Sequence, residues 1–382
     1  MKNQRVLVLG AGIAGLSSAL MMARHGFQVS IIESQSNWDI AGAGLTISGP
    51  SFRAIEALGI LEDVSALGHT HSGIKVHDPE GQVIKSILSP GIVSKTGDLL
   101  PGAGGILRGT LHHILRMHLE QLCVKVQMGV RVLDLDGALR GSTDGEPLRV
   151  TLSDARVLEV DMVVLAQGLY SSDRRTLFPR SAEPQWCGQA CWRVVVPRPT
   201  KVDQRFFYLG GRVKVGLTPV SDAEMYLFLL ESLPSNTQRK PAELFLILKE
   251  LLSEFKGEVQ GIRASLNEQS NIVYRPLDAH LISTPWYRGR VVLVGDAAHA
   301  TTPQLASGAG MAMEDAIVLT EELLHAKTLH HAYEAYFARR FERCKLVVEN
   351  SLKIGRLEQA RASALEQADV VDASLRELAR PY

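Results

Sequence analysis

An aspartate and a histidine lie three residues apart in the segment GDAAHATTPQLASGAGM, residues 295–311. An apolar run at residues 291–294 precedes them, and a helix is expected to begin near Met311. Side chains of these two types can act as a general base and a general acid. A strand that ends in a glycine turn can equally hold them as ligands of a bound cofactor. The pair Asp296 and His299 therefore raises the question of which role the segment has.

A second candidate site lies at the N-terminus, where residues 5–34, RVLVLGAGIAGLSSALMMARHGFQVSIIES, read as strand, tight turn, helix and strand. Gly10 permits the turn, Gly12 lets the backbone approach a pyrophosphate, and Gly15 lets helix and strand pack closely. The helix N-terminus offers free N–H groups to the phosphates, and an acid at the end of the second strand can bind ribose hydroxyls. We predict an ADP-ribose site made by Gly10, Ala11, Gly12, Ile13, Ala14, Gly15, Glu33 and Ser34. This motif alone does not distinguish NAD from FAD.

Two later segments favour the longer of these cofactors. Residues 158–175, LEVDMVVLAQGLYSSDRR, and residues 291–316 each combine an apolar strand with a glycine turn. A simple NAD dehydrogenase would not need such turns so far from its first βαβ unit. A cofactor with an isoalloxazine ring and a ribityl chain would need them, and we therefore predict FAD.

With these motifs in this order, the chain resembles the single-component flavoprotein aromatic hydroxylases, the para-hydroxybenzoate hydroxylase-like FAD monooxygenases. The resemblance spans nearly the whole chain and includes GAGLTISGPSFRAIEALGI at 42–60, LRGTLHHIL at 107–115 and CGQACWRVVVP at 187–197. It implies that NADH or NADPH reduces FAD, that O2 adds to give a C4a-hydroperoxyflavin, and that a small electron-rich aromatic or heteroaromatic ring is hydroxylated. An epoxidase or N-oxygenating enzyme on the same scaffold, and a non-catalytic flavin-binding regulatory protein, stay open as alternatives.

The resemblance also implies roles for individual residues. Asp296 would hydrogen-bond the ribityl chain, Arg108 would approach the phosphate and ribityl region, and Pro303 would lie beside the flavin ring. Backbone N–H groups of the loop 306–310 would face the flavin N1 and C2 carbonyl edge, where positive potential stabilises anionic reduced flavin. His299 then becomes a hydrogen-bonding residue of the turn rather than a catalytic one. The predicted flavin environment also includes Gly308, Ala309 and Gly310, and the predicted cofactor ligands include Gly44, Gln167, Gly168, Gly295 and Met311.

One predicted ligand departs from the family pattern. Gln167 stands before Gly168 where the family usually has aspartate. We expect the amide to make equivalent hydrogen bonds. The alternative hypothesis is that direct reduction by NADH or NADPH is slow here.

The predicted fold class is α/β, with a Rossmann-like FAD-binding domain interleaved with an antiparallel β-sheet substrate domain, and a helical C-terminus. We expect residues 1–72, 98–180 and 276–345 in the FAD-binding domain, 73–97 and 181–275 in the substrate domain, and 346–382 in C-terminal helices. Alternation along the strands makes six residues of the second domain candidate substrate contacts: Trp192, Arg193, Tyr208, Val215, Leu217 and Tyr226. Arg193 and Tyr226 are the catalytic candidates. The guanidinium of Arg193 would suit a carboxylate substrate, although an aspartate of the sheet could equally be the partner of this arginine.

Composition excludes several classes of protein. The 41 basic and 41 acidic residues are interspersed, so we expect no nucleic-acid partner. No run of 18 uninterrupted apolar residues occurs, and we expect a cytoplasmic protein without an integral membrane segment. The four cysteines form no CxxC pair and no HExxH occurs, so we expect no metal site. The expected partners are a small aromatic substrate and O2, in a monomer or homodimer.

Overall fold

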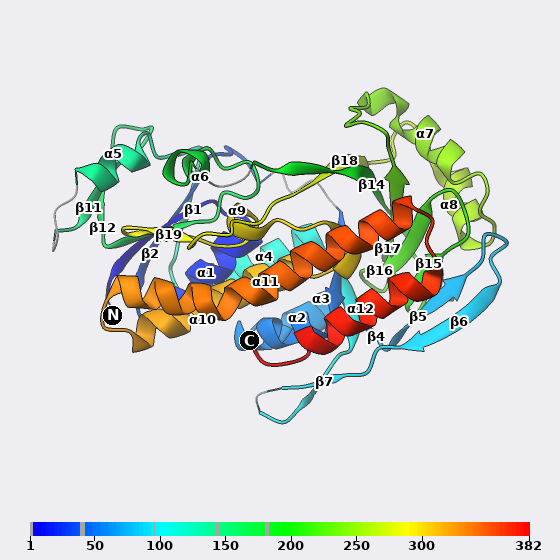
Figure 1. Ribbon diagram of the computed structural model, residues 1–382, viewed down its shortest axis with the longest axis horizontal. Helices are drawn as coiled ribbons and strands as arrows, with labels where there is room; N and C mark the ends of the chain where they lie inside the picture. Colours follow the sequence, from blue (N-terminus) through cyan, green and yellow to red (C-terminus); the bar gives the residue numbers. More distant parts are fainter. Residues whose placement is uncertain (1–2, 39–42, 95, 142–145, 180–182) are drawn as a thin grey trace.

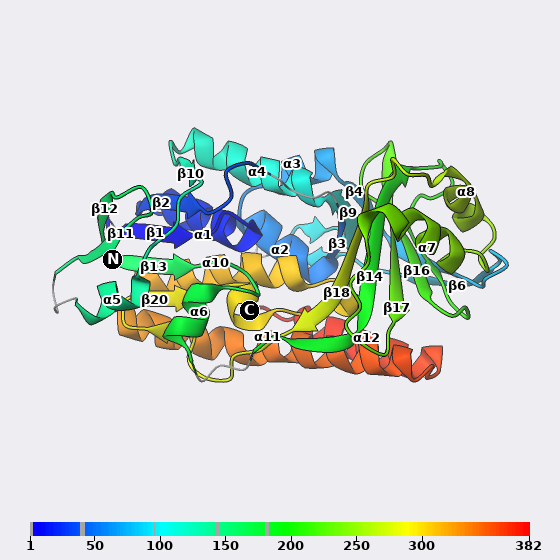
Figure 2. The same ribbon diagram turned by 90° about the horizontal axis from the view of Figure 1, so that it is seen from above.

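The computed structural model describes all residues except 1–2, 39–42, 95, 142–145 and 180–182. The motif at 42–60 is therefore described from residue 43 onward. Two β-sheets lie in opposite halves of the molecule, and the long helix α11 runs along both (Figures 1 and 2). The predicted mixed α/β fold class with a helical C-terminus is confirmed.

The first sheet has six strands, and its central ones are continuous apolar runs that are fully buried, as expected for parallel strands covered on both faces. Strand β13 (Met162–Leu165) lies between β1 (Arg5–Leu9) and β20 (Val291–Leu293), and it is parallel to both. The carboxyl ends of these three strands therefore lie side by side. The sheet is completed by β2 (Gln28–Glu33), β10 (Val126–Met128) and β19 (Tyr287–Arg288), in the order β10-β2-β1-β13-β20-β19.

Helices cover this sheet and join it to the rest of the molecule. Helix α10 (Gly308–His325) packs against α1 (Ile13–Arg24), α2 (Gly49–Ala57) and α11 (Leu329–Gln359). It begins three residues earlier than expected. Helix α11 runs without a break through residue 345, where the sequence predicted a boundary. Apart from the two helices of the second sheet, the other helices are α3 (Leu61–Leu67), α4 (Arg108–Gln121), α5 (Leu135–Arg140), α6 (Ser172–Leu177), α9 (Asp296–His299) and α12 (Ala364–Leu378).

The second sheet has seven strands in the order β18-β14-β17-β16-β15-β5-β6. All neighbours are antiparallel except β15 and β5, which are parallel. Helices α7 (Leu244–Leu251) and α8 (Glu258–Ser265) cover its outer face, and its inner face points toward the first sheet (Figure 2). The strands are β5 (Gly73–His77), β6 (Val83–Leu88), β14 (Gln185–Pro197), β15 (Arg205–Tyr208), β16 (Lys214–Pro219), β17 (Glu224–Ser232) and β18 (Ile272–Ala279).

Smaller elements complete the fold. A three-stranded sheet has β9 (Ala103–Leu107) between β3 (Gly44–Ser48) and β4 (His69–His71). The remaining elements are the pairs β7 (Ile92–Val93) with β8 (Leu99–Leu100) and β11 (Leu148–Thr151) with β12 (Val157–Val160), and the 3-10 turns η1 (Pro241–Glu243) and η2 (Pro303–Leu305).

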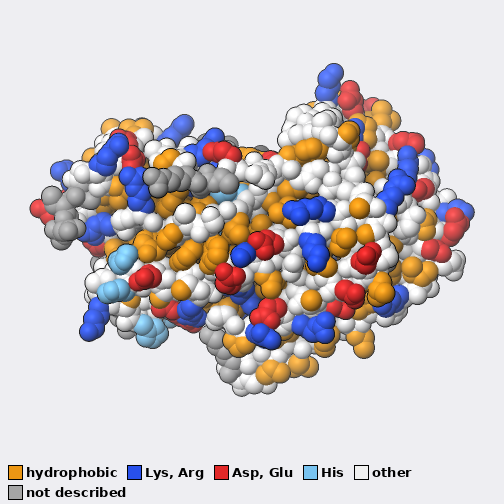
Figure 3. Space-filling view, viewed as in Figure 1, with side chains coloured by type: hydrophobic (Ala, Val, Ile, Leu, Met, Phe, Trp, Pro, Cys, Tyr) orange, Lys and Arg blue, Asp and Glu red, His pale blue; other side chains and the backbone are white. Residues whose placement is uncertain are grey.

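The surface carries both signs of charge. Lys, Arg, Asp and Glu side chains are interspersed over the face shown in Figure 3, without a stripe of one sign. None of the helices in the described part of the chain has the length and apolar character that a bilayer crossing requires.

Candidate active site

Three glycine turns meet at the carboxyl edge of the first sheet. Gly10, at φ 100°, follows β1, and a Cβ atom there would lie 2.6 Å from the carbonyl oxygen of Ala166 after β13. A Cβ atom on Gly15 would lie 1.9 Å from the Gly10 carbonyl oxygen, so close helix–strand packing requires glycine. Gly12 differs, because a Cβ atom there would have no neighbour within 4 Å. The turn therefore leaves open space above the N-terminus of α1.

Glu33 connects two loops at the same edge. Its carboxylate accepts a hydrogen bond from the Ala11 N–H at 2.9 Å, and it also accepts from the Gln35 N–H at 2.9 Å and the Ser34 hydroxyl at 3.1 Å. The carboxylate thus orders the glycine-rich turn. The predicted contact of Glu33 with a ribose stays a prediction. Ser34 is joined to the same turn because its hydroxyl donates to the Glu33 carboxylate.

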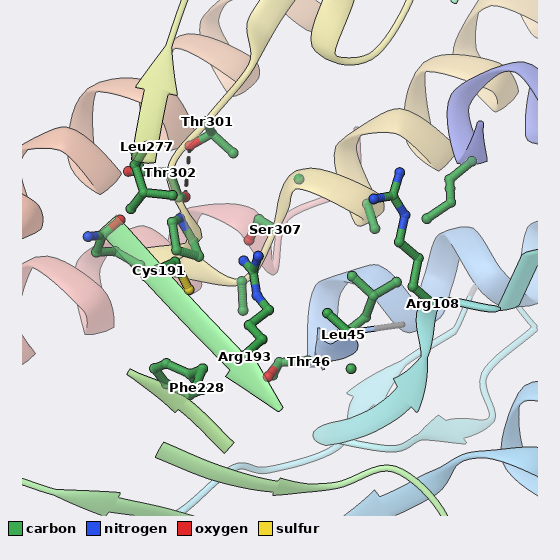
Figure 4. Close-up of a pocket in the computed structure, with 18 of the residues that line it drawn as sticks. Leu45, Thr46, Arg108, Cys191, Arg193, Phe228, Leu277, Thr301, Thr302 and Ser307 are labelled. Carbon is green, nitrogen blue, oxygen red and sulfur yellow. Dashed lines mark hydrogen bonds between the residues drawn. The ribbon is translucent and has the colours of Figure 1, made fainter. Parts of the chain in front are cut away.

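A cavity of about 360 Å³ runs from these turns to the inner face of the second sheet (Figure 4). Its walls come from the N-terminus of α1, the start of α4, the turn after β13, and residues 301–309. Sheet side chains close the far end. Among the lining residues are Gly12, Ile13, Ala14, Gly44, Arg108, Gly168, Asp296, Pro303, Gly308, Ala309, Arg193 and Tyr226.

Two opposite charges face this cavity. Asp296 begins α9 directly after Gly295, whose φ of 62° forms the turn, and its side chain is exposed to the cavity. Arg108 begins α4 and is also exposed there. Desolvation by the surrounding protein raises the pKa of the Asp296 carboxyl, although His299 and Arg108 oppose the rise. Desolvation also lowers the pKa of the Arg108 guanidinium, and the negative charge of Asp296 opposes this decrease.

The N-terminus of α10 points into the cavity. Pro303 starts the turn η2, Ala306 takes a left-handed φ of 49°, and α10 begins at Gly308. N–H groups in the first turn of a helix have no intrahelical acceptor, so this turn offers donors with the positive end of the helix dipole behind them. The Ser307 hydroxyl leaves them free, since it donates to the Leu305 carbonyl at 2.8 Å.

Two predicted residues of this segment face elsewhere. A Cβ atom on Gly310 would lie 2.1 Å from the Ser51 hydroxyl, so this glycine lets α10 and α2 approach. Met311 is 2% exposed in the core, and its N–H donates to the Ser307 carbonyl. We therefore place the helix N-terminus, rather than the Met311 side chain, at the cavity.

His299 is buried behind the turn and does not line the cavity. Its Nε2 lies 2.7 Å from Asp315 Oδ2, which also accepts the Gly295 N–H at 2.8 Å, while Arg340 Nε donates to Oδ1 at 2.8 Å. Burial alone would lower the pKa of the imidazole, but the Asp315 carboxylate outweighs it and raises that pKa well above its usual value. His299 therefore works as a structural cation that fixes the turn before Asp296.

Gln167 is held by its own loop. Its side-chain oxygen accepts a hydrogen bond from the Ser171 hydroxyl at 2.6 Å, and its Nε2 donates to Asp173 at 2.7 Å. Ala166 and Gly168 line the cavity, whereas Gln167 does not. The amide thus supports the turn, and Gly168, at φ 75°, faces the open space.

This placement predicts the behaviour of Gln167→Asp in the FAD-loaded protein. Because the side chain turns away from the cavity, we expect flavin reduction by NADH and NADPH to change by no more than about twofold, which corresponds to about 0.4 kcal/mol. Stopped-flow absorbance of both proteins measures the rate. An aspartate variant that is reduced more than tenfold faster would support the alternative hypothesis of slow reduction.

The second sheet contributes the far wall, and its strand register shows which side chains face the cavity. Arg193 pairs with Phe228, Phe228 with Gly216, and Gly216 with Phe207. Phe228 fits because a Cβ atom on Gly216 would lie 2.2 Å from its ring. Arg193, Arg205, Phe207, Lys214, Tyr226 and Phe228 line the cavity.

Four predicted substrate contacts are wrong, because their side chains lie on the opposite face of the second sheet. Side chains alternate between the two faces of a strand, so neighbours of the cavity residues point to the outer core beneath α7 and α8. Trp192, Tyr208, Val215 and Leu217 lie in that core and do not line the cavity.

Tyr226 closes the side of the cavity near β3. Its hydroxyl lies 2.6 Å from Thr46 Oγ1, and its ring lies against Gly44, where a Cβ atom would come within 1.9 Å of a ring carbon. Gly44 therefore makes room for this aromatic side chain. Its predicted contact with the cofactor stays a prediction.

A buried carboxylate links the sheet wall to η2. Glu358, near the end of α11, accepts from Lys214 Nζ at 2.8 Å and from the side-chain amides of Gln189 at 3.1 Å and Gln304 at 3.2 Å. Gly355 permits this approach, because a Cβ atom there would lie 2.9 Å from Gln189 Oε1. The sequence does not predict these contacts of Glu358. It also does not predict that Arg205, Phe207, Lys214 and Phe228 line the cavity.

Comparison with known proteins adds sequence and fold relatives. The family described as "FAD binding domain" matches residues 3–351. A Bacillus subtilis protein named as an FAD-dependent monooxygenase, YetM, is 31% identical over 355 residues, which are 92% of this chain and 93% of that protein. The 2-heptyl-3-hydroxy-4(1H)-quinolone synthase of Pseudomonas aeruginosa is 32% identical over 82% of this chain and 79% of its own. Klebsiella pneumoniae HpxO, solved with FAD and uric acid, has the same fold, with a TM-score of 0.81 at 22% identity over 98% of this chain and 92% of its own.

Proposed function

We propose that this chain, which belongs to the FAD binding domain family and is an FAD-dependent monooxygenase, uses NADH or NADPH and O2 to hydroxylate a small electron-rich aromatic or heteroaromatic substrate. The predicted family resemblance is confirmed, and so is FAD as the cofactor. One observation carries the proposal. A single cavity joins the nucleotide turn and the α10 N-terminus to a wall of aromatic and cationic side chains.

The residues present fit FAD. Open space above Gly12 and the free N–H groups of the α1 N-terminus suit a diphosphate, and Arg108 faces the same cavity. Asp296 would bind hydroxyl groups of the ribityl chain, and the first turn of α10 would bind an electron-rich ring edge. Bound FAD supplies the redox chemistry and the activation of O2 in enzymes of this type.

The chain itself supplies position and environment. The Gly308 and Ala309 N–H groups stabilise negative charge that develops on a group bound beside them. Phe207 and Phe228 offer flat apolar surfaces for an aromatic ring, and together with Pro303 they keep water away from the reacting atoms. Tyr226 places a hydroxyl on the same wall.

Two relatives support the substrate class. The Pseudomonas relative is named as the synthase of a hydroxyquinolone, and HpxO is solved with uric acid, so both names refer to heteroaromatic compounds. A small heteroaromatic ring agrees with the aromatic lining at the far end of this cavity, where Phe207 and Phe228 lie.

Substrate-stimulated oxidation of NADH or NADPH tests the proposal. The FAD-loaded protein is mixed with phenolic, aminobenzoate, hydroxypyridine and quinoline compounds, and hydrogen peroxide is measured alongside. We expect at least one compound to accelerate oxidation severalfold without an equal release of peroxide. Oxidation that no compound accelerates, or that yields only peroxide, contradicts the proposal.

A further inference from the structure

The two oxygens of the Glu358 carboxylate serve different parts of the cavity. Oε1 accepts a hydrogen bond from Lys214 of β16, whose Nζ lies 5.1 Å from the centre of the Phe207 ring. Oε2 accepts from the amide of Gln304, which follows Pro303 in η2. Lys214 and Gln304 both line the cavity, whereas Glu358 does not. The carboxylate therefore joins the aromatic wall to the turn before α10 from outside the cavity.

Gln189 of β14 closes these contacts into a ring. Its Nε2 donates to Glu358 Oε2 at 3.1 Å, and its Oε1 accepts from Gln304 Nε2 at 2.9 Å. Each of the three side chains therefore contacts the other two. Hydrogen bonds between buried groups gain strength from the low local dielectric, so the ring holds the turn against the sheet.

Two glycines allow α11 to approach β14 at this point. A Cβ atom on Gly355 would lie 2.9 Å from Gln189 Oε1, and one on Gly188 would lie 2.2 Å from Gln359 Oε1. Larger side chains at either position would push the helix away from the sheet. The sequence is therefore suited to a close contact exactly where Glu358 reaches both walls.

Helix α11 also contacts the cofactor end of the cavity. Arg340, on the same helix, donates to the carbonyl oxygen of Met311 in the first turn of α10 at 3.3 Å. Figure 2 shows α11 running along both halves of the molecule. One helix therefore supports the turn that we assign to the flavin and the wall that we assign to the substrate.

We propose that Glu358 is a positioning residue, which sets the distance between the aromatic wall and the turn that contains Pro303. This inference rests on the proposed function, because it concerns how a ring bound on Phe207 is held for oxygen transfer. A displacement of about 1 Å between reacting groups can cost a factor of about 100 in rate. A loosened wall also admits water, and oxygen is then lost as hydrogen peroxide. Glu358 thus determines what fraction of the oxidised nicotinamide yields hydroxylated product.

Glu358→Gln tests the proposal at nearly constant side-chain volume. The carboxylate has two acceptor oxygens and the amide has one, so the variant can keep Lys214 or the two glutamine amides, but not both. The FAD-loaded protein is given NADPH or NADH and the compound that best stimulates oxidation. We expect the product formed per nicotinamide oxidised to fall at least about threefold, with hydrogen peroxide making up the difference.

Binding should change much less than coupling. Because Glu358 does not line the cavity, the Kd of the compound, titrated through the perturbation of flavin absorbance, should change by less than about twofold, or about 0.4 kcal/mol. The Kd for FAD should also stay within this range. Glu349→Gln is the matched control, because Glu349 is an exposed carboxylate on the same helix, and this variant should keep full coupling.

Two further variants keep the test independent of one substitution. Glu358→Asp retains two acceptor oxygens and should keep more of the coupling than Glu358→Gln. Gln189→Leu removes one member of the ring without changing a charge or a lining residue, and it should lower coupling in the same direction. Because both side chains act through one ring, the double variant Glu358→Gln/Gln189→Leu should lose no more coupling than the more affected single variant.

The outcomes separate this inference from the proposed function. Full coupling in both Glu358→Gln and Gln189→Leu, with only the melting temperature lowered, would show that the contact serves stability alone and would refute the inference. A Kd of the compound that rises more than coupling falls would also refute it, because Glu358 would then act on affinity. A parent protein whose oxidation no compound stimulates contradicts the proposed function, and the inference with it.

Discussion

Gly12→Val should fold as the parent protein does and lose its affinity for FAD. A Cβ atom at this position meets nothing within 4 Å, and the backbone dihedrals of −73° and −178° suit valine, so neither strain nor a clash arises in the protein alone. The added methyl groups occupy the space that we assign to the diphosphate. We expect the Kd for FAD to rise at least 100-fold, or about 2.7 kcal/mol, with the melting temperature of the apoprotein unchanged. Flavin fluorescence titration and thermal unfolding measure the two quantities.

A control variant separates this effect from a general cost of valine. Gly261 in α8 is exposed, has equally open surroundings and lies on the outer side of the second sheet. Gly261→Val should bind FAD as the parent does. Tight FAD binding by Gly12→Val would show that the diphosphate lies elsewhere.

Asp315→Asn should cause the largest loss of stability. The carboxylate is fully buried and pairs with His299 at 2.7 Å and Arg340 at 2.8 Å. Removing its charge leaves two buried cations undercompensated, which typically costs about 3–5 kcal/mol. The free energy of unfolding from urea titration measures the loss. Glu322→Gln is the control, because its pair with Arg339 is partly exposed and should contribute less than about 1 kcal/mol.

The same cluster predicts how stability depends on pH. Burial alone would raise the pKa of the Asp315 carboxyl, but His299 and Arg340 outweigh it and lower that pKa, whereas the pKa of His299 is raised. Asp315 therefore stabilises the fold above its unfolded pKa of about 3.9 and loses this contribution as pH falls through its lowered value. His299 stabilises it fully below about pH 6.5 and loses this contribution as pH rises through its raised value.

The contribution of the pair is therefore greatest between about pH 4 and pH 6.5. We expect the difference in unfolding free energy between parent and Asp315→Asn to be largest in this window and to shrink in stronger acid. A difference that is constant from pH 3 to pH 9 would show that the charges of the pair are not responsible.

Much of the nucleotide half could be predicted from sequence, for a physical reason. The three glycine turns each follow a short, wholly apolar run, and such runs become adjacent parallel strands whose carboxyl ends share one edge. The local pattern therefore predicts the strands and their turns, whereas the resemblance to the flavoprotein hydroxylases implies that the turns after Leu9, Leu165 and Leu293 converge. The start of α10 was placed three residues late because Gly308 and Gly310 have low helix propensity, whereas contact with Ser51 favours glycine there.

The substrate wall could be predicted only in part. Alternation marks two faces of each strand but does not say which face is buried under helices, and a shift of one residue exchanges them. Alternation predicts Trp192 and Tyr208 as substrate contacts, yet both side chains lie in the core under α7 and α8. Glu358 could not be found, because its partners Lys214 and Gln189 are far away in sequence and no local motif marks the contact.

The fate of O2 tests the central claim most directly. The FAD-loaded enzyme is supplied with NADPH or NADH, 18O2 and the compound that best stimulates oxidation, and the product is analysed by mass spectrometry. The account predicts one atom of 18O in the aromatic product for each nicotinamide oxidised. A product without 18O, with hydrogen peroxide formed in equal amount to the nicotinamide consumed, would contradict it.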